Sequence, residues 1–341
     1  WSGRIMSLLF GSFSIILVYL LSTMFFSKRV GLISSFIFAV SPYQMFWARI
    51  YMDEALLFFV LISAYLFLKD YKTKGYITPI SALFLGIGAL IKIISGVFIV
   101  VFSVFLIISV YNNRNNPEIY KKSVKNALYF FIVIAICLIP LISYNYFLYK
   151  SKGMVDLPFA MYLGINIEVY QGPGLAHGDG FMLSRLPKNL KDVGVEYFFK
   201  QDTMAFALFL FGLIFFLRDM KKGKEKSFEK YFLLTLFAFP LLFIASTIVL
   251  DTHYTYFTAF FAIFAGPFIS FIGDKIGKQN AKRAIYIILI LILLINLYQL
   301  KNVITSKSAT GKLRDFAIEN IGQNDLVIAD ARIYRGNTVW M

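Results

Sequence analysis

Charged residues are scarce in this sequence. They make up 16% of its 341 residues, whereas hydrophobic residues make up 59%. A soluble globular domain carries about 25% charged residues. This shortage, together with a mean hydropathy of +0.70, excludes an ordinary soluble domain and predicts an all-α polytopic membrane protein.

Cysteine is nearly absent as well. The sequence has one, Cys137, and it lies inside an apolar run. A single cysteine excludes an intrachain disulfide. We interpret Cys137 as a small packing residue.

Ionisable residues are missing from the middle of every long apolar run. Proton- and ion-coupled transporters usually carry charges at membrane depth, often beside broken helices. Their absence argues against a transporter. A lipid flippase stays open as an alternative, and it would require a polar groove across the membrane.

Long apolar runs are what the sequence has in abundance. A membrane-spanning helix needs about 20 mostly apolar residues. The runs predict about ten transmembrane helices, of which the second to fourth could instead be partly re-entrant. They cover residues 5–26, 30–46, 54–68, 76–91, 93–111, 127–149, 204–217, 231–250, 254–272 and 284–300.

The connections between these runs alternate in charge. The Lys- and Arg-rich ones are residues 28–29, 69–74, 114–125, 218–230 and 275–283. The positive-inside rule places this set in the cytoplasm. The net charge of +15 then reflects topology and contact with anionic lipids, and not nucleic-acid binding.

The opposite, short outer connections hold few cations, namely Arg4, Arg49 and Lys92, and several acids. Residues 41–54 place Arg49, Asp53 and Glu54 between two apolar runs. Charge at the mouth of an apolar segment is costly unless it meets a partner, a ligand or water. We therefore predict that the functional chemistry lies on the outer face.

The chain divides into two parts by composition. Residues 1–300 are predicted to form the transmembrane domain, with a long outer loop at 150–202 that either covers the substrate or is a passive linker. Residues 301–341 are more polar and predict the start of a small extracytoplasmic α/β segment, with a helix at 311–321 and a strand at 326–329. We expect further sequence before residue 1 and after residue 341.

Four motifs in order resemble the integral-membrane GT-C glycosyltransferases. Gly3 and Arg4 open one membrane helix, Ser41 and Pro42 close the next, residues 49–59 start a third, and residues 85–92 end a fourth. The resemblance covers roughly residues 1–148 and is nearest to protein O-mannosyltransferases and to the aminoarabinose transferase that modifies lipid A.

This resemblance implies a polyprenyl- or dolichyl-phosphate sugar as donor. It also implies transfer, with inversion, to a protein, lipid or glycan acceptor on the extracytoplasmic face of the plasma membrane. Relatives carry an acidic first outer loop before the Gly-Arg helix, and that loop is not in this chain. Some relatives use a metal and others do not, so the cofactor stays open.

The chemistry assigns roles to particular residues. Breaking a lipid-phosphate bond leaves an anion that fixed cations stabilise, and an acceptor needs a carboxylate to remove or orient its proton. The candidate catalytic residues are Asp53 and Glu54, and the candidate substrate-binding residues are Arg4, Arg49, Lys92, His177, Asp251 and His253.

Each of these residues has a plainer interpretation. Asp53 could cap the helix that it precedes, with Glu54 favourable in the first turn. Arg4 and Lys92 could be interfacial anchors, and the residues of the outer loops could be ordinary loop residues. A rival enzyme is a polyprenyl-linked glycan ligase or polymerase, for which the single Arg of the long outer loop is a poor match.

Overall fold

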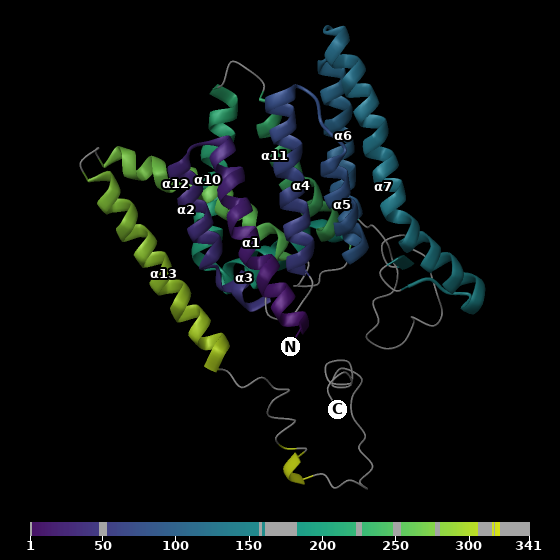
Figure 1. Cartoon of the computed structure of the whole chain (residues 1–341). Helices are drawn as coiled ribbons and strands as arrows, with labels where there is room; N and C mark the ends of the chain where they lie inside the picture. Colours follow the sequence, from purple (N-terminus) through teal and green to yellow (C-terminus); the bar gives the residue numbers. More distant parts are fainter. Residues whose placement is uncertain are drawn as a thin grey trace.

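The computed structural model describes residues 2–47, 53–156, 159–160, 183–222, 227–247, 254–276, 280–305, 316 and 318–320. Its elements are helices, arranged as a bundle flanked by α7 and α13 (Figure 1). They are α1 (Ser2–Phe25), α2 (Lys28–Ala39), α3 (Pro42–Trp47), α4 (Asp53–Lys74), α5 (Ile80–Ile91), η1 (Ile93–Ser95), α6 (Gly96–Asn112), α7 (Pro117–Lys152), η3 (Leu183–Arg185), α9 (Leu186–Asp192), η4 (Val193–Phe199), α10 (Thr203–Lys222), α11 (Phe228–Ala245), α12 (Tyr256–Lys275) and α13 (Ala281–Thr305).

Seven helices of the described chain are long and apolar enough to cross a membrane, which confirms an integral membrane protein. They lie in α1, the η1–α6 stretch, α7, α10, α11, α12 and α13. Each apolar run predicted from the sequence corresponds to helix. The predicted α/β segment lies almost wholly outside the described residues.

One predicted run, residues 30–46, is divided in two. α2 ends at Ala39, and α3 begins at Pro42. Proline disfavours helical backbone in the residue before it and fits the first position of a helix. Ser41 and Pro42 therefore end one helix and begin the next.

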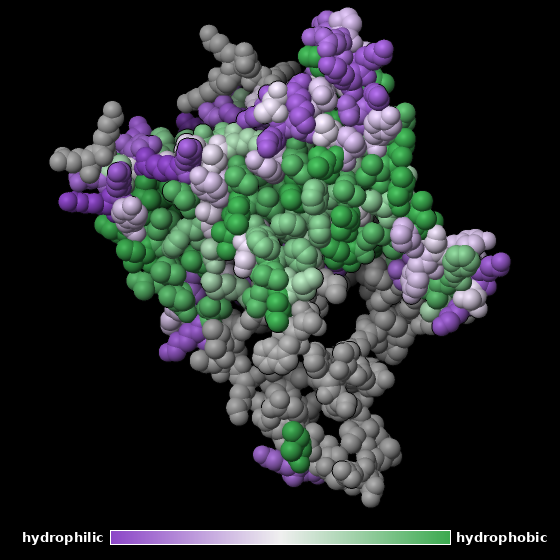
Figure 2. Space-filling view, viewed as in Figure 1, coloured by the Kyte–Doolittle hydropathy of each residue, from purple (hydrophilic) through white to green (hydrophobic). Residues whose placement is uncertain are grey.

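The Lys- and Arg-rich connections meet at one end of the bundle, called here the basic end. Lys72 Nζ lies 2.8 Å from the Met24 carbonyl oxygen, and Arg29 forms a 2.7 Å ion pair with Asp274. Figure 2 shows hydrophilic side chains gathered at the top of the molecule, above a hydrophobic belt. The opposite end, where α4 begins, is called the site end.

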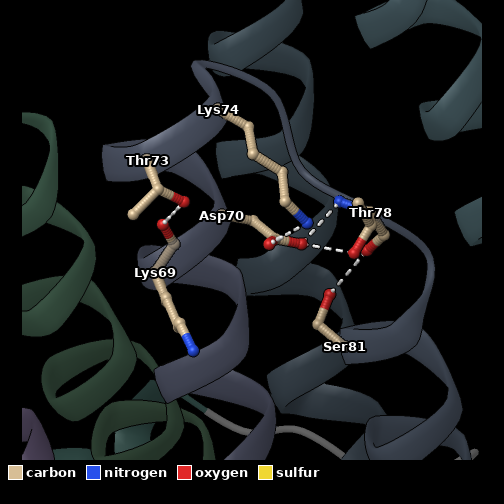
Figure 3. A network of polar contacts seen from close by, with 6 residues as sticks. All are labelled: Lys69, Asp70, Thr73, Lys74, Thr78 and Ser81. Carbon is tan, nitrogen blue, oxygen red and sulfur yellow. Dashed lines mark hydrogen bonds and ion pairs between the residues drawn. The ribbon is translucent and has the colours of Figure 1, made fainter.

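A buried carboxylate fastens the turn between α4 and α5 at the basic end (Figure 3). Asp70 accepts hydrogen bonds from the backbone N–H and the hydroxyl of Thr78, and forms a 2.7 Å ion pair with Lys74. Further along the same hairpin, the Ser63 hydroxyl donates to the Ser81 carbonyl. These contacts set the register between α4 and α5 and so fix which residues meet at their other end.

α12 is the central helix of the bundle. In its most apolar stretch, 83% of the residues are buried. The helix packs against α2, α10 and α13. Aromatic rings fill the space around it, including Phe209 and Phe261 with centroids 4.5 Å apart. Because α12 touches so many neighbours, side chains at its first turn can reach residues from several helices.

Small residues allow α10 and α12 to approach closely. A Cβ added at Gly212 of α10 would overlap the backbone of Phe264 in α12. Without a hydrophobic driving force between helices in lipid, such close packing contributes much of the association.

We therefore expect Gly212→Ala to destabilise the bundle by about 1–3 kcal/mol, because the helix backbones must separate. The matched control is Gly96→Ala, where nothing lies within 4 Å of the added carbon. Thermal unfolding of the detergent-solubilised protein measures both. Equal melting temperatures for the two variants would contradict the close α10–α12 contact.

Candidate functional site

Asp53, the first residue of α4, lies in a buried ion pair at the site end. Its side chain is 2% exposed, and Oδ1 lies 2.7 Å from Lys92 Nζ. The same oxygen accepts a hydrogen bond from the Tyr256 hydroxyl. One carboxylate oxygen therefore joins α4, the α5–η1 turn and α12.

Lys92 reaches this position because α5 ends beside it. Its backbone is extended, with φ −154° and ψ 124°, between the last turn of α5 and the single turn η1. Its side chain is 29% exposed, against 2% for Asp53. The ammonium group therefore contacts the buried carboxylate while part of the side chain stays accessible.

Glu54 is buried with a different set of partners. It is fully buried, and it accepts a hydrogen bond from Gln44 Nε2 of α3. Gln44 Oε1 in turn accepts from the Thr258 hydroxyl at 2.9 Å. Glu54 Oε1 has no hydrogen-bond partner among the described residues, so this carboxyl keeps an acceptor that a further group could use.

The two neighbouring acids thus diverge. Adjacent helical residues point about 100° apart, and Asp53 turns toward Lys92 and Tyr256 while Glu54 turns toward Gln44. Each acid joins α4 to other elements of the bundle. Their contacts go beyond what the end of a single helix requires.

The depth of these acids follows from the length of α4. Asp53 and Asp70 are 17 residues apart in one helix, which corresponds to about 25 Å. The hydrocarbon core of a bilayer is about 30 Å thick. With Asp70 at the basic end, Asp53 lies near the boundary between hydrocarbon and headgroups, where a lipid phosphate is found.

The arrangement supplies three chemical functions in one place. Lys92 provides a fixed positive charge, Asp53 a carboxylate that can accept a proton, and Glu54 a buried acid with a vacant acceptor oxygen. The described residues contain no group of three or more His, Cys, Asp and Glu side chains that could hold a metal ion. Asp53 and Glu54 are the described carboxylates that could contribute oxygen ligands to one.

The structure brings three of the predicted site residues to one end of α4 and α5, namely Asp53, Glu54 and Lys92. Arg4 belongs to the first turns of α1, and its side chain lies outside the described part of the structure. The remaining predicted residues lie outside the described residues altogether: Arg49, His177, Asp251 and His253.

Three residues that bond to the acids directly, or to Glu54 through Gln44, were not predicted from the sequence. Gln44 lies in the 41–54 stretch, where a lone amide among apolar residues was the available signal. Tyr256 and Thr258 begin an apolar run that is otherwise typical of a membrane helix. Nothing local in the sequence connects that run to residues more than 200 positions away.

A protein-family model matches the part of the chain that contains these acids and Lys92. Residues 1–144 match the model of the dolichyl-phosphate-mannose-protein mannosyltransferase family, and this segment contains Asp53, Glu54 and Lys92. No curated protein sequence matches the chain.

Solved structures extend the similarity to nearly the whole chain. The oligosaccharyltransferase of Archaeoglobus fulgidus, crystallised with zinc and sulfate, has a TM-score of 0.53 at 14% identity, covering 96% of this chain and 44% of that one. The same organism's AglB oligosaccharyltransferase, in complex with an inhibitory peptide and a dolichol-phosphate, has a TM-score of 0.50 at 15% identity, covering 92% and 46%. The chain has the GT-C fold.

The GT-C fold confirms the resemblance inferred from the order of the sequence motifs. The chain spans less than half the length of the archaeal structures that it matches. Within the GT-C fold, the acids at the start of α4 and the cation at the end of α5 lie in the segment that the mannosyltransferase family model covers.

Proposed function

We propose that this chain forms the membrane core of a glycosyltransferase, which moves a sugar from a dolichyl- or polyprenyl-phosphate donor to an acceptor. The observation that carries the proposal is the ion pair of Asp53 and Lys92, located near the headgroup level. The family model names a dolichyl-phosphate-linked donor. A cation near the headgroup level can stabilise the phosphate of such a donor.

Lys92 is the proposed contact for the donor phosphate. The donor carries a negative charge, which competes with Asp53 for the ammonium group. Binding of the phosphate to Lys92 would release the Asp53 carboxylate from its partner. The exchange places an anionic leaving group beside a fixed cation and a free base beside the sugar.

Transfer then requires one displacement. An oxygen or nitrogen of the acceptor attacks the anomeric carbon while the bond from that carbon to the phosphate oxygen breaks. The acceptor proton passes to Asp53, and the lipid phosphate leaves with its added negative charge next to Lys92. A single displacement of this kind inverts the anomeric carbon.

A peptide is the acceptor that the comparisons favour. The matching family is named for protein mannosylation, and one similar structure holds an inhibitory peptide. The positive-inside rule supports an extracytoplasmic site, because the Lys- and Arg-rich connections lie at the end of the bundle opposite Asp53. We place this site in the plasma membrane as part of the same proposal.

The positions of the buried carboxyl groups in the described part of the chain argue against the flippase alternative. Charged groups at membrane depth usually mark a transport pathway. The buried carboxyl groups of the described chain lie toward the two ends instead: Asp53, Glu54 and Asp202 at the site end and Asp70 at the basic end.

The test is transfer by the purified full-length protein in liposomes that contain dolichyl phosphate mannose, with a hydroxyl-rich peptide as acceptor. We expect labelled sugar to appear on the peptide in proportion to the lipid phosphate released. Movement of the labelled lipid between leaflets without transfer would instead identify a flippase.

A further inference from the structure

Asp202 is a buried carboxylate that the proposed transfer step does not use. It is 1% exposed and directly precedes α10. Its Oδ2 accepts a hydrogen bond from the hydroxyl of Ser41, which is 161 residues away in the chain. Besides preceding α10, Asp202 therefore joins the start of α10 to the start of α3.

Ser41 connects this carboxylate to helix α3. While its hydroxyl donates to Asp202, the same oxygen accepts a hydrogen bond from the Gln44 backbone N–H at 3.2 Å. Ser41, Pro42 and Gln44 occupy the N-cap, first and third positions of α3, the pattern of a capping box. In that motif the third side chain returns to the N-cap, but the Gln44 side chain reaches Glu54 instead.

Helix α3 depends on these contacts for its position. It has six residues, and isolated helices shorter than about 12–15 residues are marginal in water. The junction before it is also held by α13, because Asn296 Nδ2 donates to the Val40 carbonyl at 2.9 Å. Fixing Ser41 therefore fixes the orientation of Gln44, and Gln44 fixes one oxygen of Glu54.

We propose that Asp202 is a positioning residue, which acts through Ser41 and Gln44 to hold Glu54 in the site. The inference rests on the proposed function, with Glu54 as the second candidate catalytic acid of the site. The line of contacts itself, from α10 through α3 to α4, is independent of the reaction.

The charge state of Asp202 guides the choice of variants. Burial raises the pKa of this carboxyl to about 7, and the Ser41 hydroxyl and the Ala205 backbone partly offset that rise. A neutral side chain of the same shape can therefore take its place. Asp202→Asn keeps an acceptor oxygen for Ser41, whereas Asp202→Ser keeps a capping hydroxyl for α10 but is too short to reach Ser41.

In the transfer assay with the full-length protein, we expect Asp202→Ser and Ser41→Ala each to lower kcat about 10- to 100-fold, the size of effect that follows from a misplaced catalytic group. The KM for the donor should change little, and Asp202→Asn should restore most of the rate. The matched control is Ser14→Ala, a buried serine whose hydroxyl bonds only to the Phe10 carbonyl of its own helix. Wild-type kcat in Asp202→Ser would overturn the proposal and leave Asp202 as a helix cap.

A second measurement does not depend on activity. Ser41→Ala and Glu54→Gln are combined, and the melting temperatures of the single and double variants are compared. Coupling through Gln44 predicts that the double variant loses less than the sum of the two single losses. Additive losses would overturn the proposal, whereas absence of transfer by the wild-type protein would overturn the proposed function alone.

Discussion

Asp53→Asn in the full-length protein is expected to lower kcat for sugar transfer by about 10²- to 10⁴-fold, the range typical of a lost general base. Asparagine has the size of aspartate and can still accept the hydrogen bond from Tyr256, but it cannot take a proton from the acceptor. The substitution also frees Lys92 from its 2.7 Å ion pair. The KM for the phosphate donor should therefore stay the same or fall.

Initial rates over a range of donor concentrations measure both effects. The matched control is Asp70→Asn, which removes a buried carboxylate from the other end of the same helix. It should affect stability and leave kcat close to that of the wild type. If Asp53→Asn turns over within twofold of the wild type, Asp53 is a structural residue at the start of α4 and the base lies elsewhere.

Lys92→Gln is expected to weaken donor binding by about 10- to 100-fold. A hydrogen bond to a charged group contributes about 1.5–3 kcal/mol, and each 1.4 kcal/mol is a factor of ten in affinity. The KM for the acceptor should not change, because the proposed substrate contact of the ammonium group is with the donor phosphate and not with the acceptor. Binding of a labelled dolichyl phosphate to the reconstituted protein measures the loss directly.

The control for Lys92→Gln is Lys74→Gln, because Lys74 also forms a 2.7 Å ion pair with a buried aspartate of α4, at the basic end. Its donor affinity should equal that of the wild type. Should Lys92→Gln bind the donor as tightly as Lys74→Gln does, Lys92 is only the ion-pair partner of Asp53. The phosphate contact would then belong to another cation.

Local sequence patterns predicted the helices well because a membrane helix is formed by one continuous run of apolar residues. The apolar runs located the membrane helices, and the break at Lys92 between α5 and α6 was expected from its charge between two such runs. Pro42 begins α3, although the apolar run that contains it predicts one helix over residues 30–46. The direction of α3 depends on Asp202 and Asn296, which lie far along the chain.

The site was predictable in its charged residues and not in their partners. Asp53, Glu54 and Lys92 stood out because charges are rare beside apolar runs. Tyr256 and Thr258 resemble ordinary residues of a membrane helix, and their role follows only from the tertiary contacts that bring them to Asp53 and Gln44. Asp202 was the last residue of the predicted outer loop, and its burial and its hydrogen bond to Ser41 depend on residues far along the chain.

The position of Asp53 near the headgroup level has a kinetic consequence for the proposed transfer. A reactive centre at the rim of the bilayer meets its donor by diffusion within the leaflet, and not by collision from the bulk solution. The quantity that governs saturation is then the mole fraction of donor among the surrounding lipids. Diluting the liposomes at fixed composition should leave that contribution to the rate unchanged, whereas diluting the donor with other phospholipids should lower it.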